Sequence, residues 1–177
     1  MRAPPTLPLY NSSILHTDLT ILGAAYGRAD VTHTVHRRIS NYETLSVDAS
    51  NTIFGDSWPG VGKSLIVVYQ HQGYHPRVSV TREDHTLNID ARPEVSNPTT
   101  VNHPIHQLTI VGAAYGLSEV TSKVRSLVRH EHLDVVASND VFGDSWFGTP
   151  KTLVVVYQYG NGPYRTVIAT EGNRLRI

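Results

Sequence analysis

The sequence contains no cysteine, and its 15 Lys and Arg residues are balanced by 15 Asp and Glu residues. Without cysteine, a disulfide framework, a thiolate zinc site and a thiol nucleophile are excluded. Because the charges balance, the chain lacks the basic field that draws proteins to phosphate backbones, so we expect no nucleic-acid partner. The absence of thiols also fits a reducing cytoplasm.

Long apolar runs are missing as well. No stretch approaches the roughly 18 apolar residues of a membrane helix, so we expect no membrane partner. Residues 1–8 (MRAPPTLP) have no continuous apolar core and do not resemble a signal peptide. We therefore predict a cytoplasmic location, while export without a leader sequence stays open. The 40% apolar and 17% charged residues are typical of a globular protein.

What the sequence does contain is a long internal repeat. Residues 19–27 (LTILGAAYG) return as residues 108–116 (LTIVGAAYG), and residues 49–58 (ASNTIFGDSW) return as residues 137–146 (ASNDVFGDSW). A repeat of this length is a whole folding unit rather than one turn of a solenoid. Units of about 70 residues are marginally stable alone, so we expect the repeats to pack on each other or on another copy of the chain.

These boundaries predict four segments: an extended arm at residues 1–18, repeat one at 19–89, a linker at 90–107 and repeat two at 108–177. Within each repeat, apolar residues mostly alternate with period two, as in strands. We predict a strand in the arm at residues 7–10 and repeat-one strands at residues 20–26, 45–49, 64–70, 77–80 and 86–89. Val31, Val35 and Ile39 recur at helical spacing and predict one short helix. The predicted fold is mainly β, with two antiparallel β-sandwich or open-barrel repeats related by a pseudo-twofold axis, each with one short helix.

The strongest candidate site is a loop that both repeats share. It combines an amide, a carboxylate and an indole, in Asn51, Asp56 and Trp58 and again in Asn139, Asp144 and Trp146. A tryptophan face stacks on the C–H face of a sugar, while Asn and Asp bind its hydroxyl groups. The same oxygens suit calcium, which is the only cofactor left open. A structural role also stays open, because Gly-Asp is ordinary turn chemistry and tryptophan often closes a small β core.

Catalytic and metal-binding interpretations are weaker. Ser57 follows Gly-Asp as in some serine esterases, and Asp30 and His33 form an Asp-x-x-His pair, but repeat two has Glu119 and Ser122 at those positions. The closely spaced histidine pairs also lack counterparts in the other repeat: His33 and His36, His71 and His75, His103 and His106, and His130 and His132. A phosphate-binding loop at residues 60–64 (GVGKS) is unlike the usual pattern, because a strand follows it instead of a helix. We predict no catalytic residues and no metal ligands.

Each repeat resembles a known domain family through an ordered set of short motifs. The order is Ala-x-Tyr-Gly, Asp-Val-Thr-x-x-Val, Asn-x-x-x-Gly-Asp-x-x-x-Gly, Lys-x-Leu-x-Val-x-Tyr and a final Glu-Gly-x-x-Leu-x-Ile. The family is similar to the C-terminal domain of DnaJ-type mitochondrial co-chaperones and to modules appended to bacterial glycoside hydrolases or found alone in fungi. Repeat one departs from it at Asp84, where the family has glycine, and repeat two at Glu119, where it has aspartate. The resemblance implies a β-rich domain without catalysis and, from its association with sugar enzymes, carbohydrate binding.

We therefore predict a non-catalytic, lectin-like protein with glycans as partners and one weak site in each repeat. Duplication would then supply avidity rather than tight binding at a single site. The alternative is a structural or protein-interaction module, for which the co-chaperone resemblance is the argument. A hydrolase is the third interpretation, using Asp56 and Asp144 or Ser57 and Ser145.

Overall fold

The computed structural model describes residues 18–41, 43–90 and 107–177. Nearly all of the predicted arm and linker therefore lies outside the described residues. So do the strand predicted at residues 7–10 and the histidine pair at positions 103 and 106.

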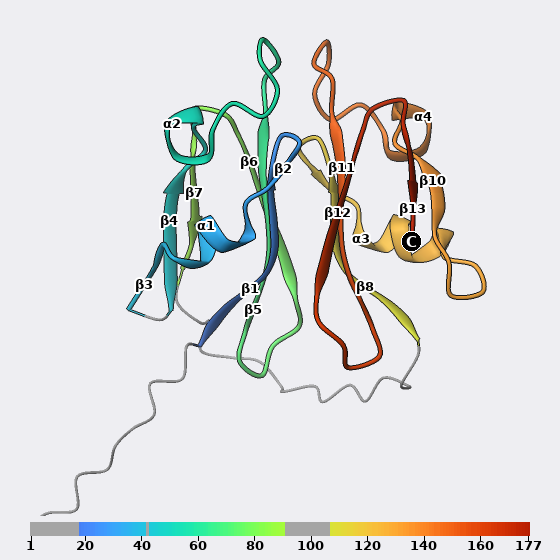
Figure 1. Cartoon of the computed structure of the whole chain (residues 1–177), viewed down its shortest axis with the longest axis horizontal. Coiled ribbons are helices and arrows are strands. Elements are labelled where there is room, and N and C mark those ends of the chain that lie inside the picture. Colours follow the sequence, from blue (N-terminus) through green and yellow to red (C-terminus); the bar gives the residue numbers. More distant parts are fainter. Residues whose placement is uncertain (1–17, 42, 91–106) are drawn as a thin grey trace, which may run out of the picture.

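Short strands and very short helices alternate along both halves of the chain (Figure 1). The first half contains β1 (Leu19–Tyr26), β2 (Ala29–Asp30), α1 (Thr32–His36), β3 (Ile39–Ser40), β4 (Thr44–Asp48), α2 (Asn51–Phe54), β5 (Ser64–His71), β6 (Arg77–Arg82) and β7 (Thr86–Ile89). The second half contains β8 (Leu108–Tyr115), β9 (Ser118–Glu119), α3 (Thr121–Leu127), β10 (Asp134–Val136), α4 (Asn139–Phe142), β11 (Thr152–Tyr159), β12 (Arg165–Thr170) and β13 (Arg174–Arg176). None of these helices is long and apolar enough to cross a membrane.

The strands form several antiparallel sheets, so the mainly β prediction is confirmed. One four-stranded sheet has the order β2-β1-β5-β6, and a smaller sheet in the same half has the order β3-β4-β7. The second half contains the four-stranded sheet β12-β11-β8-β9 and the two-stranded sheet β10-β13. In Figure 1 the two four-stranded sheets lie side by side in the middle, and the small sheets and helices lie outside them.

The prediction of one short helix in each repeat is wrong, because each described half has two. The second is α2 in the first half and α4 in the second, a single turn that begins directly after a serine. Ser50 O accepts hydrogen bonds from the backbone N–H groups of both Ile53 and Phe54. Four residues are too few to show helical periodicity in a sequence. Ile39 is also misplaced by that periodicity, because it begins β3 instead of extending α1.

Strand β1 is buried on both faces because it separates two hydrophobic cores. Ile21, Ala24 and Tyr26 pack into the core of the first half, together with residues of α1, β4, β5 and β7. Leu22 and Ala25 instead pack against the second half. A β-bulge between Ile21 and Gly23 interrupts the alternation of side chains, so that Leu22 and Gly23 both face the second half. Strand β8 has a bulge at the corresponding place.

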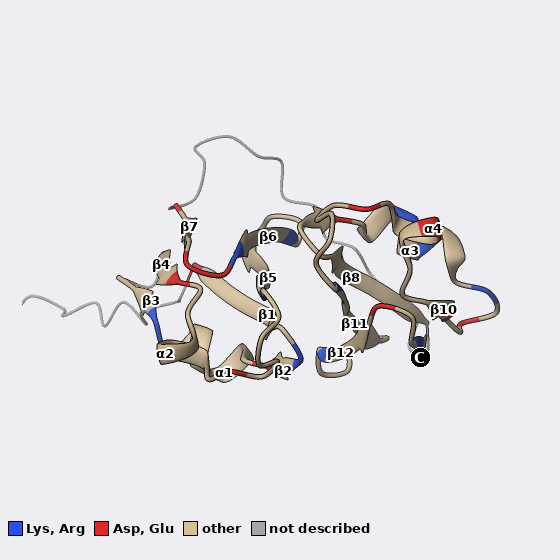
Figure 2. Ribbon diagram, turned by 90° about the horizontal axis from the view of Figure 1, so that it is seen from above, with Lys and Arg blue, Asp and Glu red and all other residues tan. Residues whose placement is uncertain are grey.

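The two halves meet through their four-stranded sheets. Leu22, Val68, Val111 and Val156 form one apolar cluster across the contact, and Ala25, Ile66, Ala114 and Val154 form a second. Two glycines allow the sheets to approach closely. A Cβ atom at Gly23 would lie 2.5 Å from Val156 Cγ2, and one at Gly112 would lie 2.7 Å from Val68 Cγ1. Seen from above, acidic and basic positions are interspersed over both halves (Figure 2).

Candidate functional site

The carboxylate of Asp56, a predicted ligand-binding residue, is occupied by a buried lysine. Lys63 Nζ lies 3.0 Å from Asp56 Oδ1 and 3.2 Å from Glu83 Oε1, and it donates to Val61 O at 3.0 Å. The Lys63 side chain is only 2% exposed. The ammonium therefore joins the shared loop to the start of β5 and to the turn after β6.

Electrostatics in this cluster favour the charged forms of the lysine and of its two carboxylate partners, and the neutral form of the neighbouring tyrosine. The hydrogen bond from Lys63 lowers the pKa of the Asp56 carboxyl. Burial opposes the charge on Lys63, but the bonds to Asp56 and Glu83 outweigh it and raise the pKa of the ammonium. Burial, together with the neighbouring Glu83, raises the pKa of the Tyr26 phenol well above its usual value. At neutral pH the cluster is a lysinium held by two carboxylates beside a neutral tyrosine.

Asn51 and Ser57 also have partners inside the first half. Tyr26 donates its hydroxyl hydrogen to Asn51 Oδ1 at 3.1 Å, which ties α2 to the end of β1. Ser57 Oγ donates to Tyr26 O at 2.8 Å and accepts from Arg28 N at 3.1 Å. Asp30 Oδ1 accepts hydrogen bonds from the backbone N–H and the hydroxyl group of Thr32.

The second half repeats these contacts at the equivalent residues. Lys151 Nζ lies 3.0 Å from Asp144 Oδ1 and 3.3 Å from Glu171 Oε2. Tyr115 donates to Asn139 Oδ1 at 3.0 Å, and Ser145 donates to the backbone oxygen of Tyr115 at 2.9 Å. The motif shared by both halves is therefore a device that holds a loop on the end of a sheet.

Both tryptophans are half-buried and lie where the two loops meet. The guanidinium carbon of Arg28 lies 4.0 Å from the centre of the Trp58 ring, an arrangement typical of a cation–π contact. Trp146 packs against the opposite half, because a Cβ atom at Gly62 would lie 3.2 Å from its Cζ2 atom. Trp58 and Trp146 line one narrow cavity between the halves, which is too small for a sugar.

The structure thus divides the predicted site residues into two groups. Asn51, Asp56, Asn139 and Asp144 face partners within their own half, whereas Trp58 and Trp146 face the junction between halves. Calcium would have to displace a buried lysine from Asp56 or Asp144. Within residues 18–41, 43–90 and 107–177, no group of three His, Asp or Glu side chains is arranged to hold a metal ion.

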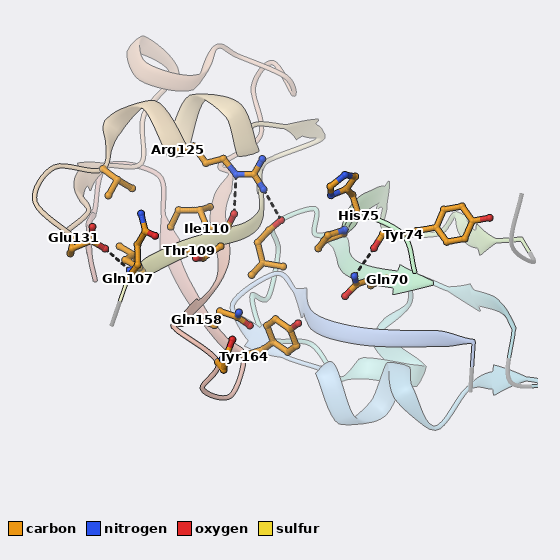
Figure 3. Close-up of a pocket in the computed structure, with 15 residues that line it drawn as sticks. Gln70, Tyr74, His75, Gln107, Thr109, Ile110, Arg125, Glu131, Gln158 and Tyr164 are labelled. Atoms are coloured by element: carbon orange, nitrogen blue, oxygen red, sulfur yellow. Dashed lines mark hydrogen bonds between the residues drawn. The ribbon is translucent and has the colours of Figure 1, made fainter. Parts of the chain in front are cut away.

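A much larger cleft opens between the halves at the other end of the sheets (Figure 3). Its volume is about 820 Å³. The β5–β6 hairpin, the first strand of the second half, helix α3 and the β11–β12 hairpin form its walls. Polar and aromatic side chains dominate the lining, among them Gln70, His75, Thr109, Arg125, Glu131, Gln158, Asn161 and Tyr164.

Several of these side chains are fixed by the backbone. Gln70 Nε2 donates to Tyr74 O at 2.5 Å, and Gln158 Nε2 donates to Gly160 O at 2.9 Å, so each amide is held against its own hairpin. Tyr164 is 42% exposed, and Figure 3 shows its ring beside Gln158 in the cleft. The Tyr74 ring points away from the cleft in the same view.

The cleft was missed in the sequence because its distinctive residues occur in only one repeat. The position of Arg125 in α3 corresponds to His36 in α1, and that of Tyr164 corresponds to Pro76. The residues that both repeats share are those that hold each half together, whereas Arg125 and Tyr164 differ between the repeats.

No protein-family model matches the chain, and no curated protein or solved structure matches it.

Proposed function

We propose that the chain is a non-catalytic carbohydrate-binding protein with one principal site, in the cleft between its halves. The supporting observation is the combination of an exposed tyrosine ring with fixed side-chain amides in a cleft of about 820 Å³. Ligand sites commonly have volumes of about 300–1,000 Å³. An exposed aromatic face suits the C–H face of a sugar, and the amide oxygens of Gln70 and Gln158 suit its hydroxyl groups.

This proposal moves the site away from the two shared loops. Asn51 and Asp56 are hydrogen-bonded within the fold, and a ligand would have to break those contacts to use them. We also propose that the halves descend from one duplicated unit and are related by a pseudo-twofold axis. The recurrence of the lysine, tyrosine and serine contacts in both halves supports that origin.

A glycan array followed by calorimetric titration of the strongest ligand tests the carbohydrate proposal. We expect Tyr164→Ala to lower affinity about tenfold, the usual scale of a lost aromatic contact. Tyr159→Ala is a matched control, because Tyr159 is also exposed, at 37%, but does not line the cleft. Binding that is unaffected by Tyr164→Ala but is abolished by replacing Trp58 and Trp146 would return the site to the loops. A chain that binds no glycan would refute the proposal.

Self-association is a second candidate function, and Phe147 favours it. This side chain is 93% exposed at the loop tip, next to Trp146, where repeat one has Pro59. With the adjacent, half-buried Trp146 it would form the contiguous apolar surface that such a contact needs. Sedimentation velocity over a concentration series should show an oligomer that Phe147→Ser converts to monomer. A wild-type chain that stays monomeric throughout would contradict this candidate.

A further inference from the structure

Arg125 is held in the cleft by two backbone carbonyl groups of the neighbouring strand. Its Nε atom donates to Ile110 O at 2.9 Å, and its Nη2 atom donates to Val111 O at 3.4 Å (Figure 3). Both carbonyl groups belong to the bulged part of β8, where the register with β11 shifts. The bulge thus provides acceptors that fix an exposed arginine at one orientation.

These two bonds leave one end of the guanidinium group unused. A guanidinium group has five N–H donors in a rigid plane. Bonds from Nε and Nη2 occupy one edge of that plane, and the end formed by Nη1 and Nη2 still presents two parallel N–H groups. This end matches a carboxylate, which binds such a pair of donors with both oxygens. Among the residues that the structure describes, Arg125 takes part in no ion pair.

We propose that the ligand of the cleft is an acidic sugar, whose carboxylate binds the Nη1–Nη2 end of Arg125. This inference rests on the proposed carbohydrate function and adds the charge of the ligand to it. The sugar ring would lie against Tyr164, and its hydroxyl groups would reach the amides of Gln70 and Gln158. Uronic acids and sialic acids both carry a carboxylate on a pyranose ring, and either one fits.

The other ionisable groups of the cleft are compatible with an anionic ligand. Glu131 is the acidic residue among those lining it, and its Oε2 atom accepts a hydrogen bond from Leu108 N at 2.5 Å. That carboxylate is therefore turned toward the backbone. His75 lies on the opposite wall from Arg125 (Figure 3). In the first half, the position of Arg125 is occupied by His36, whose imidazole has no pair of parallel N–H donors. We therefore expect one acidic-sugar site in each chain.

Titration with matched pairs of glycans tests this inference. The probes are one oligosaccharide ending in glucuronate and one ending in sialic acid, each compared with its carboxyl-reduced, neutral counterpart. We expect carboxyl reduction to lower affinity about 10- to 100-fold, because a charge-assisted pair of hydrogen bonds is lost. Arg125→Gln should remove the difference between acidic and neutral probes. Arg125→Lys keeps the positive charge but not the paired donors. This variant should therefore retain only part of the preference for acidic probes.

Arg129→Gln is the matched control, because Arg129 is exposed nearby but does not line the cleft. It should leave the preference for acidic probes unchanged. Equal binding of acidic and neutral probes would overturn the acidic-sugar inference and leave carbohydrate binding intact. An acidic preference that survives Arg125→Gln, in a variant with the wild-type melting temperature, would also overturn it. Failure of every glycan to bind would refute both proposals.

Discussion

The contact of Gly112 with the opposite half gives the most direct test of how the sheets pack. A Cβ atom at Gly112 would lie 2.7 Å from Val68 Cγ1 and 2.9 Å from Val78 Cγ2. Carbon atoms pack best about 3.5–4.0 Å apart. Gly112 is not among the residues with positive φ, so alanine adds crowding without backbone strain. We expect Gly112→Ala to lower the free energy of unfolding by about 1–3 kcal/mol, the usual cost of overpacking an interior.

A double-mutant cycle with Val68→Ala shows whether crowding is the cause. Val68→Ala alone is also destabilising, because it leaves a cavity between the sheets. It removes both Val68 methyl groups that a Cβ atom at Gly112 would meet. We therefore expect the cost of Gly112→Ala to fall in the Val68→Ala background, with a coupling free energy of about 1 kcal/mol. Urea unfolding followed by tryptophan fluorescence measures each free energy, provided that the m-value stays constant.

Gly172→Ala is the control for this cycle. Gly172 has a φ of +82°, and a Cβ atom there would meet nothing within 4 Å. Its substitution should cost stability through backbone strain and should be additive with Val68→Ala. If Gly112→Ala costs the same whether residue 68 is valine or alanine, the described packing of the halves is refuted.

Two further predictions concern the buried lysine cluster. Lys63→Met should lower the free energy of unfolding by about 3 kcal/mol. This value is near the lower end for a broken buried ion pair, because the Glu83 side chain is 18% exposed. Urea unfolding measures the change, and a variant as stable as the wild type would contradict the role of the cluster. Stability should also depend on pH at both extremes. The pKa values of Asp56 and Glu83 are lowered, so their contribution is present above the ordinary carboxyl pKa of about 4 and is lost as pH falls further. The pKa values of Tyr26 and Lys63 are raised, so their contribution is present below about pH 10 and is lost at higher pH. The melting temperature, measured between pH 2 and pH 12, should therefore be highest between about pH 4 and pH 10. Glu83→Gln should make the fall of the melting temperature below about pH 4 less steep.

The strands were predictable because their signal is local. The segment at 64–70 is a run of β-branched and apolar residues, and β5 covers it and extends to His71. The strand predicted at residues 86–89 coincides with β7. The bulge in β1 was not predictable, because it depends on the register with β5 and on the second half that covers Leu22. The sequence around Leu22 only shows an unbroken run of apolar and small residues.

The candidate site shows a different limit. Asn51, Asp56 and Trp58 were selected because both repeats contain them, but the partners of these side chains could not be seen in the sequence. Lys63 is near in sequence, whereas Glu83 is far from it and approaches only because β5 pairs with β6. Composition alone cannot distinguish a carboxylate that awaits a ligand from one that holds a lysine. Arg125 directly follows a shared motif but is replaced by His36 in the first half, and the orientation of its guanidinium group depends on the carbonyl groups of β8.

The burial of the two middle sheets on both faces affects how the protein fluctuates. Amides of β5 and β11 lie between neighbouring strands and under apolar layers from both sides. Water can reach them only if the halves separate or a whole half unfolds, so their hydrogen exchange should report global opening. The small outer sheets supply one of those apolar layers, so we expect each of them to open together with the half to which it belongs.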